Sequence, residues 1–316
     1  MTKETFSWDA INKPVLVLAP MANITTLPFR SICKEMGADI VFTPMFSANA
    51  IIHNAKKTLA LATFRKTEQP VIVQIFGYDG ETLARAANIV QERLKPAGID
   101  INMGCPAPKV TGNESGSALL RDYDNAFIII KKVRESFEGQ LSVKVRLGWS
   151  EKDVLPFLIK LEKIGIDAIS VHGRTTKEGY HGKADWLAIE AIISELNIPV
   201  IGNGDIDSLE SANIAFQIKG IAGIMIGRGS LGNPWLFKTI KEQALYKPTL
   251  YEFKDIILRQ TNLSIEYLDN EERAIREMRK HLGWYLKKFG CPKELRVQAV
   301  RANSIKEVID LLSKID

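Results

Sequence analysis

Short apolar runs alternate with longer segments of helical period over about the first 245 residues of the chain. The apolar runs, rich in β-branched residues, predict eight strands at 15–19, 39–42, 71–75, 98–101, 142–145, 168–171, 200–202 and 223–226. Helices are predicted between them at 80–94, 118–137, 153–164, 186–196 and 208–217, often after an Asp, Ser or Gly that can cap a helix. Strands that are apolar throughout are typical of a parallel sheet covered on both faces. Eight strand–helix units therefore favour an α/β protein with a closed (β/α)8 TIM barrel over an open doubly wound sheet.

The strand pattern stops near Tyr246, where Lys247-Pro248 interrupts the chain. The remaining sequence has helical period and predicts helices at 253–268, 272–289 and 294–313. We therefore predict two domains, a barrel over residues 1–245 and a small all-α domain over residues 246–316.

Composition excludes several classes of protein. The apolar fraction of 46% and the charged fraction of 25% are near the average for soluble globular proteins. No run of about 18 uninterrupted apolar residues occurs, so no membrane span is expected. The first residues lack the apolar core of a signal peptide, which favours a cytoplasmic protein. The three cysteines are widely spaced and odd in number, which fits neither a disulfide framework nor a metal site. A monomer is expected.

Positive charge is concentrated in the helical domain. Ten Lys or Arg residues but only two acids lie between Arg273 and Lys306, and Arg276 and Arg279 are among the basic ones. A basic helical block can neutralise phosphates, whereas the simplest alternative is a solvated helix face.

Cys105 is the first candidate for chemistry. It lies between Gly104 and Pro106, directly after the apolar run 98–101. A thiol at the end of a strand can act as a nucleophile, a metal ligand or a proton donor. Its ordinary pKa of roughly 8.5 keeps it largely protonated near neutral pH, which makes proton donation a serious candidate.

Polar residues and glycines recur at the carboxyl ends of the predicted strands, where barrel enzymes carry their active sites. They are Pro20-Met21, Gln74, Asn102 with Cys105, Lys144 with Arg146, His172 with Arg174, Asn203-Gly204-Asp205 and Gly227-Arg228. The last two groups form turns whose backbone amides can bind a phosphate. A cation such as Lys144 favours the anionic reduced form of a flavin, so Gln74 and Lys144 are assigned to a cofactor held by that phosphate.

Together these stretches resemble the tRNA-dihydrouridine synthase family, flavoproteins built from a barrel and a C-terminal helical domain. The resemblance covers about residues 15 to 240 and rests on Ala19-Pro-Met-Ala22, Asn102-Met-Gly-Cys-Pro106, Gly116-Ser-Ala-Leu-Leu120, Lys144-Val-Arg146, Val171-His-Gly-Arg-Thr175, Gly182-Lys-Ala-Asp-Trp186, Asn203-Gly-Asp-Ile206, Gly227-Arg228 and Asn233-Pro-Trp-Leu-Phe237. Two positions depart from the family pattern. Asn23 replaces a usual glycine, and the loop 111–115 carries an acid where relatives are often basic.

The resemblance implies FMN as cofactor, NADPH as its reductant and tRNA as substrate. FMN would be bound by Pro20, Met21, Ala22, Gln74, Lys144, His172, Asn203, Gly204, Asp205, Gly227 and Arg228. A hydride would pass from the flavin to carbon 6 of a uridine while Cys105 protonates carbon 5. Asn102 would contact the uracil, and Arg146, Arg174, Arg276 and Arg279 are assigned to RNA binding.

Several alternatives remain open at this point. The same barrel occurs in small-molecule flavin reductases that act on enones or free pyrimidines, and ribosomal RNA could replace tRNA as substrate. A non-catalytic RNA-binding protein with a vestigial barrel is a third reading, against which Cys105, Lys144 and His172 argue. The position of the target uridine, the choice between NADPH and NADH, and the partner of His172 (flavin or uracil) are not fixed by the sequence.

Overall fold

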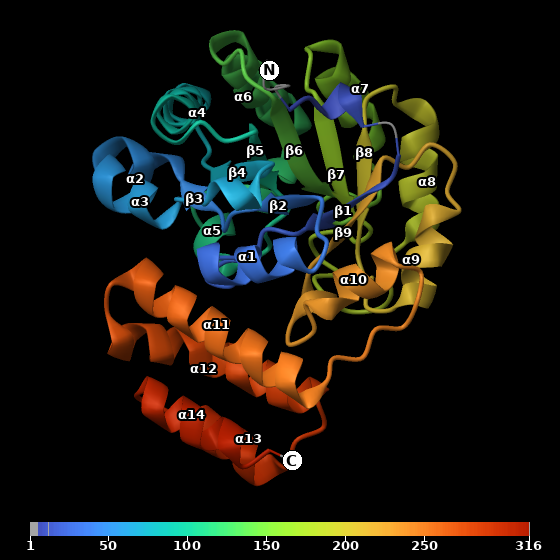
Figure 1. Cartoon of the computed structure of the whole chain (residues 1–316). Helices are drawn as coiled ribbons and strands as arrows, with labels where there is room; N and C mark the ends of the chain where they lie inside the picture. Colours follow the sequence, from blue (N-terminus) through green and yellow to red (C-terminus); the bar gives the residue numbers. More distant parts are fainter. Residues whose placement is uncertain (1–5, 12, 316) are drawn as a thin grey trace, which may run out of the picture.

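Eight parallel strands close into a barrel in the computed structural model, which describes residues 6–11 and 13–315. The strands are β1 (Val15–Leu18), β2 (Ile40–Phe42), β4 (Val71–Phe76), β5 (Gly98–Met103), β6 (Leu141–Arg146), β7 (Ala168–His172), β8 (Val200–Asn203) and β9 (Gly223–Ile226). Pairing runs in chain order around the ring, with β1 beside β9 and β2 beside β4. The two-residue strand β3 (Phe46–Ser47) pairs in parallel with the last residues of β4. The predicted TIM barrel is confirmed (Figure 1).

Helices cover the outside of the barrel, as the alternating pattern predicts. They are α1 (Leu27–Glu35), α4 (Gly80–Leu94), α6 (Tyr123–Ser136), α7 (Leu155–Lys163), α8 (Trp186–Glu195), α9 (Leu209–Phe216) and α10 (Trp235–Lys241), with the short additions α2 (Ala48–His53), α3 (Ala55–Leu61) and α5 (Pro108–Thr111). The predicted single helix 118–137 is wrong at its start. The chain first forms a 3-10 turn, η3 (Gly116–Arg121), and α6 begins only after Asp122, whose side chain accepts a hydrogen bond from the Asn125 amide.

The C-terminal domain is all helical, as predicted. It consists of α11 (Leu250–Leu268), α12 (Glu271–Lys288), α13 (Lys293–Ala299) and α14 (Ile305–Ser313). The predicted helix 294–313 is wrong because it is two helices. Ser304 is extended and its hydroxyl accepts a hydrogen bond from the Glu307 amide, which starts α14 separately from α13. The predicted domain boundary at 245 and 246 lies in the segment between α10 and α11.

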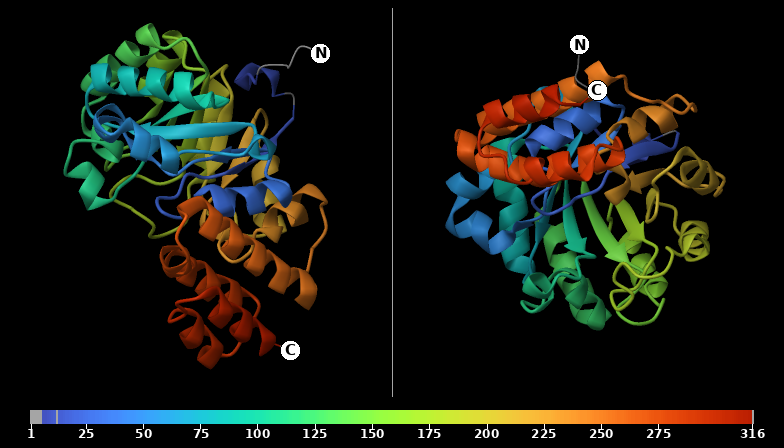
Figure 2. Two further views of the ribbon diagram at one scale, coloured as in Figure 1. Left: turned by 60° about the vertical axis from the view of Figure 1, so that its left-hand side comes forward. Right: turned by 90° about the horizontal axis from the view of Figure 1, so that it is seen from below.

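The two domains share buried contacts, so their relative position is fixed by packing. Ile32 of α1 and Trp235 of α10 belong to the same apolar cluster as Phe253 of α11 and Leu282 of α12. The views in Figures 1 and 2 agree that α11 lies against α1. Close approach is greatest at Gly232, where φ is +66° and an added Cβ would lie 2.3 Å from the Trp284 carbonyl carbon. Only glycine fits this contact between barrel and helical domain.

Among the helices of the described residues, none combines the length and the apolarity that crossing a membrane would require.

Candidate active site

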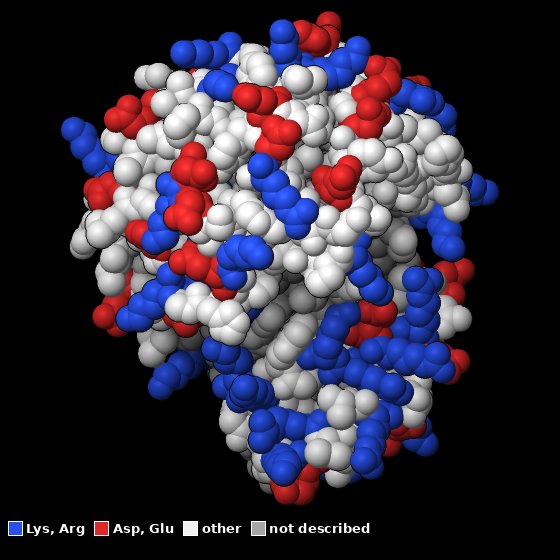
Figure 3. Space-filling view, turned by 180° about the vertical axis from the view of Figure 1, so that it is seen from behind, with Lys and Arg blue, Asp and Glu red and all other residues white. Residues whose placement is uncertain are grey.

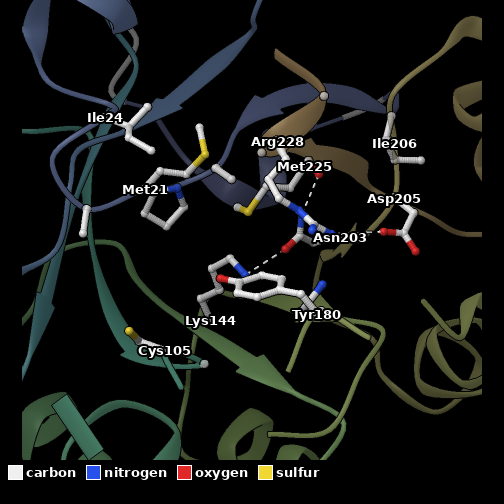
Figure 4. Close-up of a pocket in the computed structure, with 18 of the residues that line it drawn as sticks. Met21, Ile24, Cys105, Lys144, Tyr180, Asn203, Asp205, Ile206, Met225 and Arg228 are labelled. Atoms are coloured by element: carbon white, nitrogen blue, oxygen red, sulfur yellow. Dashed lines mark hydrogen bonds and ion pairs between the residues drawn. The ribbon is translucent and has the colours of Figure 1, made fainter. Parts of the chain in front are cut away.

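A cavity of about 840 Å³ opens at the carboxyl ends of the barrel strands. Thirteen of the residues singled out from the sequence line it: Pro20, Met21, Ala22, Asn102, Cys105, Lys144, Arg146, His172, Asn203, Gly204, Asp205, Gly227 and Arg228. They come from segments far apart in the chain, because parallel strands deliver all their carboxyl ends to one face of a barrel. Figure 4 shows Cys105 on one side of this cavity and Asp205 and Arg228 on the other.

The Cys105 loop is held by hydrogen bonds on both sides of the cysteine. Asn102 Oδ1 accepts from the Cys105 amide at 2.9 Å and from the Gly104 amide at 3.1 Å. The Cys105 carbonyl accepts from the Ser117 hydroxyl at 2.9 Å and from the Ser117 amide at 3.1 Å. Gly116, with φ +62°, is required here, since a Cβ would lie 2.9 Å from the Cys105 carbonyl oxygen. The backbone that carries the thiol is therefore held in place, and burial raises the pKa of the thiol above its ordinary value.

A buried hydrogen-bond chain supports Asn102 from below. Asn102 Nδ2 donates to Gln74 Oε1 at 2.8 Å, and Gln74 Nε2 donates to Asp100 Oδ2 at 2.7 Å. Asp100 Oδ1 accepts from the Ser142 hydroxyl at 2.7 Å. Burial raises the pKa of Asp100 to about 7, against the opposing effect of these hydrogen bonds. Gln74, assigned from the sequence to the cofactor, is fully buried and is not among the lining residues, so its contact with the site runs through Asn102.

Lys144 supplies a positive charge to the cavity. Its Nζ donates to Asn203 Oδ1 at 2.9 Å, and Asn203 Nδ2 donates in turn to the Met225 carbonyl at 2.7 Å, as the dashed lines in Figure 4 show. Burial, and then the positive charge of Arg146, lower the Lys144 pKa to about 8. The hydrogen-bond partner is an amide and not a carboxylate, so the contact leaves the ammonium charge unneutralised.

His172 is buried at the end of β7, and burial together with Lys144, Arg146, Arg174 and Arg228 lowers its pKa to about 2. Its imidazole is therefore neutral. Arg174 Nη1 lies 3.4 Å from His172 Nε2, and a guanidinium can only donate, so Nε2 is the acceptor and Nδ1 carries the proton.

Arg174 and Arg146 bind neighbouring loops of the protein itself. Arg174 donates to the His181 and Gly182 carbonyls at 2.9 and 2.7 Å and pairs with Asp205 at 2.6 Å; it is not among the lining residues. Arg146 lines the cavity but donates to the carbonyls of Gly104, Thr175 and Gly179 at 2.8, 2.9 and 2.8 Å. Both arginines join loops that follow different strands. These hydrogen bonds hold the loops that form the cavity walls in fixed positions relative to one another.

The turns after β8 and β9 pack against each other opposite Cys105. An added Cβ at Gly229 would lie 2.2 Å from the Ile206 carbonyl oxygen, so the two turns approach as backbones. Arg228 is about half exposed, lies 3.4 Å from Asp205 and stacks 4.7 Å above the Tyr180 ring centroid. Among the described residues, the backbone amides of Asp205, Arg228 and Gly229 have no hydrogen-bond acceptor. Free amides beside an arginine suit an anionic group.

The two arginines predicted in the helical domain differ from each other. Arg276 is exposed and, among the residues that the structure describes, pairs only with Glu272 on its own helix. Arg279 is only partly exposed and joins α12 to the segment before α14, donating to the Ala302 carbonyl at 2.8 Å and to Asn303 Oδ1 at 2.6 Å. Figure 3 shows Lys and Arg side chains gathered on the helical domain beside a hollow in the surface.

Several lining residues were not singled out from the sequence, among them Ile24, Met45, Tyr180, Leu231 and Lys288. Met45 follows the short strand β2, so its place at a strand end was a usable signal. Lys288, at the last turn of α12, reaches the cavity only because the helical domain docks beside the mouth.

Asn23, which departs from the family pattern, has φ +59°. Asparagine is among the residues other than glycine that adopt this left-handed conformation most readily, so the turn after β1 is preserved. Within the described residues, three or more His, Cys, Asp or Glu side chains nowhere come together as metal ligands would.

Known proteins match this chain along almost all of its length. A family model described as "Dihydrouridine synthase (Dus)" matches residues 17–315. A probable tRNA-dihydrouridine synthase of Aquifex aeolicus is 34% identical over 300 residues, covering 94% of each chain. A tRNA-dihydrouridine synthase B of Pasteurella multocida is 39% identical over 279 residues, covering 86% of this chain and 83% of the relative.

Solved structures show the same barrel at much lower identity. Histamine dehydrogenase from Rhizobium sp. 4-9 superposes with a TM-score of 0.58 at 14% identity, covering 81% of this chain and 51% of that one. A 2-naphthoyl-CoA reductase gives the same TM-score at 12% identity, covering 75% and 53%. These two likenesses show the fold alone, whereas the sequence matches establish descent. The chain belongs to the dihydrouridine synthase family.

Proposed function

We propose that this chain is a tRNA-dihydrouridine synthase, which reduces the C5–C6 double bond of uridine in tRNA with FMN as cofactor and NADPH as reductant. The observation that carries the proposal is a protonated Cys105 thiol on a firmly bonded loop, facing a cavity whose far wall offers free backbone amides and Arg228. The names of the relatives, which span most of the chain, support the same reaction.

The residues of the cavity fit a flavin mononucleotide. The free amides of Asp205, Arg228 and Gly229, together with the Arg228 guanidinium, would hold its phosphate. Met21 and Met225 would line its ring system, and Lys144 with Asn203 would face its polar edge. When bound, the flavin supplies the hydride that NADPH provides. Lys144 keeps a positive charge next to it at neutral pH, because its lowered pKa of about 8 still lies above 7.

Cys105 supplies the proton that the other carbon of the double bond needs. Its raised pKa keeps the sulfur protonated across the physiological range, which suits a general acid. Asn102 holds the backbone on which the thiol stands, and Gln74 and Asp100 hold Asn102. A neutral His172 has its Nε2 occupied by Arg174, so it acts as a hydrogen-bond donor through Nδ1.

RNA binding is assigned to the helical domain and to the cavity mouth. The target base has to leave its stack to enter the cavity, which costs a few kcal/mol. Phosphate contacts from exposed cations such as Arg276 and Lys288 offset that cost.

Reconstitution tests the proposal directly. The purified protein is expected to carry a yellow chromophore that NADPH bleaches, and to form dihydrouridine in tRNA from cells that lack this enzyme class. Mass spectrometry of nuclease-digested tRNA would identify the product and map the modified position. Free uridine, an enone and ribosomal RNA serve as competing substrates in the same assay. A colourless protein, or reduction of the small molecules in preference to tRNA, would contradict the proposal.

A further inference from the structure

A second cavity, of about 280 Å³, lies in the seam between the barrel and the helical domain. The barrel contributes the turn after β1, including Asn23, and the segment around Met45 and Phe46. The helical domain contributes one face of α11 and one face of α12. None of these residues takes part in the chemistry assigned to the first cavity, apart from those that border both.

The two cavities adjoin. Ala22 and Met45 line both of them. Helix α12 also borders both, with Arg273, Glu277 and His281 at the second cavity and Lys288 at the first. These four positions are spaced by four, four and seven residues, which places them along one face of a helix. The two cavities therefore share part of one wall and border the same face of α12.

His281 gives the second cavity an unsatisfied polar group. Its side chain is 4% exposed, and among the described residues its Nδ1 has no hydrogen-bond partner. Burial, and then the charge of Lys280, lower the pKa of His281 to about 3, so the imidazole is neutral. One of its two nitrogens is then a hydrogen-bond donor and the other an acceptor. Phe29 and Trp284 pack against the ring at 5.1 and 5.2 Å between centroids and hold its orientation. Nδ1 is enclosed by protein, whereas Nε2 is not enclosed and also has no hydrogen-bond partner among the described residues. Because His281 lines the cavity, Nε2 is the ring nitrogen that a ligand there can reach.

Cations and apolar groups surround this imidazole. Arg273 is exposed at the rim and forms no ion pair among the described residues, whereas Lys280 pairs with Glu277 at 2.5 Å. Met278 and Phe46 provide apolar wall. A flat heterocycle with hydrogen-bonding edges, joined to a phosphate, matches this combination of apolar wall, neutral imidazole and free guanidinium.

We propose that the second cavity binds one unpaired nucleobase of the RNA, next to the target uridine in sequence, with His281 bonding the base edge and Arg273 its phosphate. The cavity has about a third of the volume of the first, so it takes a single base and no second flavin-sized group. This inference rests on the proposed function and deepens it, because it adds a second point of recognition that helps to choose which uridine is reduced.

The test combines protein and RNA changes. His281→Phe keeps an aromatic ring but removes the bonding edge, and Arg273→Gln removes the rim charge at an exposed position that does not endanger folding. His53→Phe, on an exposed histidine of α2, is the matched control. Each protein is assayed with the tRNA transcript and with transcripts that carry an abasic residue on the 5′ or the 3′ side of the mapped uridine. Flavin content and melting temperature verify folding.

The expected result is coupling between the residue and one flanking base. With wild type and His53→Phe, one abasic site raises KM by about five- to tenfold, the size of one lost buried hydrogen bond. With His281→Phe, KM with the intact transcript is already raised by a similar factor and the abasic site adds nothing. Arg273→Gln raises KM about threefold for the intact transcript, as loss of one phosphate contact does.

Additive effects of His281→Phe and both abasic sites would overturn the inference, as would an unchanged KM in both variants. If His281→Phe loses flavin or melts early, Arg273→Gln decides, and an unchanged KM there overturns the inference. Failure of the proposed function is distinguishable, because wild type would then form no dihydrouridine with any transcript.

Discussion

The barrel mouth and the helical domain use charged and polar side chains in different ways. At the mouth, Asn102, Arg146 and Arg174 are buried and bonded to partners in the surrounding loops and strands. On the helical domain, Arg276 is 60% exposed and bonded only along its own helix. Function at the mouth therefore depends on where an atom lies, whereas function on the helical domain depends on how much charge is present. Substitutions in the two regions should differ in size and in salt dependence.

The largest effect is expected from Cys105→Ala. Loss of the general acid should lower the rate of dihydrouridine formation by about 10²- to 10⁴-fold. Flavin content and reduction by NADPH should not change, because the thiol lies across the cavity from the phosphate turns. Cys291→Ala removes a thiol outside the cavity and should leave the rate unchanged. Full activity of Cys105→Ala, measured in single turnover, would remove this residue from the acid role.

The substitution Gln74→Leu tests whether Gln74 contacts the cofactor directly or supports Asn102. Without Gln74, Asn102 loses the partner that orients it, and the Cys105 backbone loses its anchor. We expect kcat to fall about ten- to a hundredfold with flavin content unchanged, since small misplacements of a reacting group have effects of this size. Ser142→Ala is the matched control, because it removes the other partner of Asp100 and leaves the chain from Gln74 to Cys105 in place. A flavin-free Gln74→Leu protein that regains activity with added FMN would instead favour a direct cofactor contact.

The pH dependence of the chemical step should follow Cys105 and Lys144. Under the proposed function the protonated thiol is the active form and its pKa is raised, so the proton supply is lost only above the ordinary thiol value, whereas Lys144, with a pKa of about 8, loses its charge earlier. The loss approaches tenfold for each further unit of pH. His172 contributes no acid limb near neutrality, because its pKa is about 2. An alkaline limb that begins near pH 7 in single-turnover rates would contradict the assignment.

The smallest effect is expected from Arg276→Gln. Removal of one exposed charge should weaken RNA binding about two- to threefold at moderate salt and reduce the slope of log Kd against log salt by about one. Lys219→Gln, exposed before β9 and so at the opposite end of the strand from the mouth, should change neither quantity. Arg279→Gln should lower the melting temperature instead, because Arg279 joins α12 to Ala302 and Asn303. Equal RNA binding by the Arg276 and Lys219 variants would show that this face is merely solvated.

The sequence predicted the features that depend on local pattern. All eight barrel strands lie within two residues of their expected bounds, because a buried parallel strand is a short apolar run with few competing readings. The residues at their ends then identified about half of the cavity lining, since a closed barrel leaves those residues only one face to occupy. The helix breaks at Asp122 and Ser304 were missed because the helical period of the sequence continues across both positions. The side chains of Asp122 and Ser304 cap a new helix there, and a periodic pattern does not reveal this.

Features that depend on tertiary packing were not predicted. Gln74 and Arg174 lie near strand ends like the lining residues. Their side chains, however, form hydrogen bonds with residues that come close only in the folded chain. Lys288 and the whole second cavity arise from docking of α12 beside the turn after β1, about 250 residues away in sequence. No local pattern in the sequence distinguishes His281 from the other histidines.

The contact at Gly232 has a consequence for how a nucleic acid would be handled. That turn lies directly against the backbone of α12 and a shared apolar cluster packs behind it, so buried contacts hold the helical domain against the barrel. The distance between the basic surface of the helical domain and the Cys105 sulfur is then set by this packing. Under the proposed function, the RNA itself has to bend to bring its base into the cavity. The shape of the RNA would then decide which nucleotide is modified.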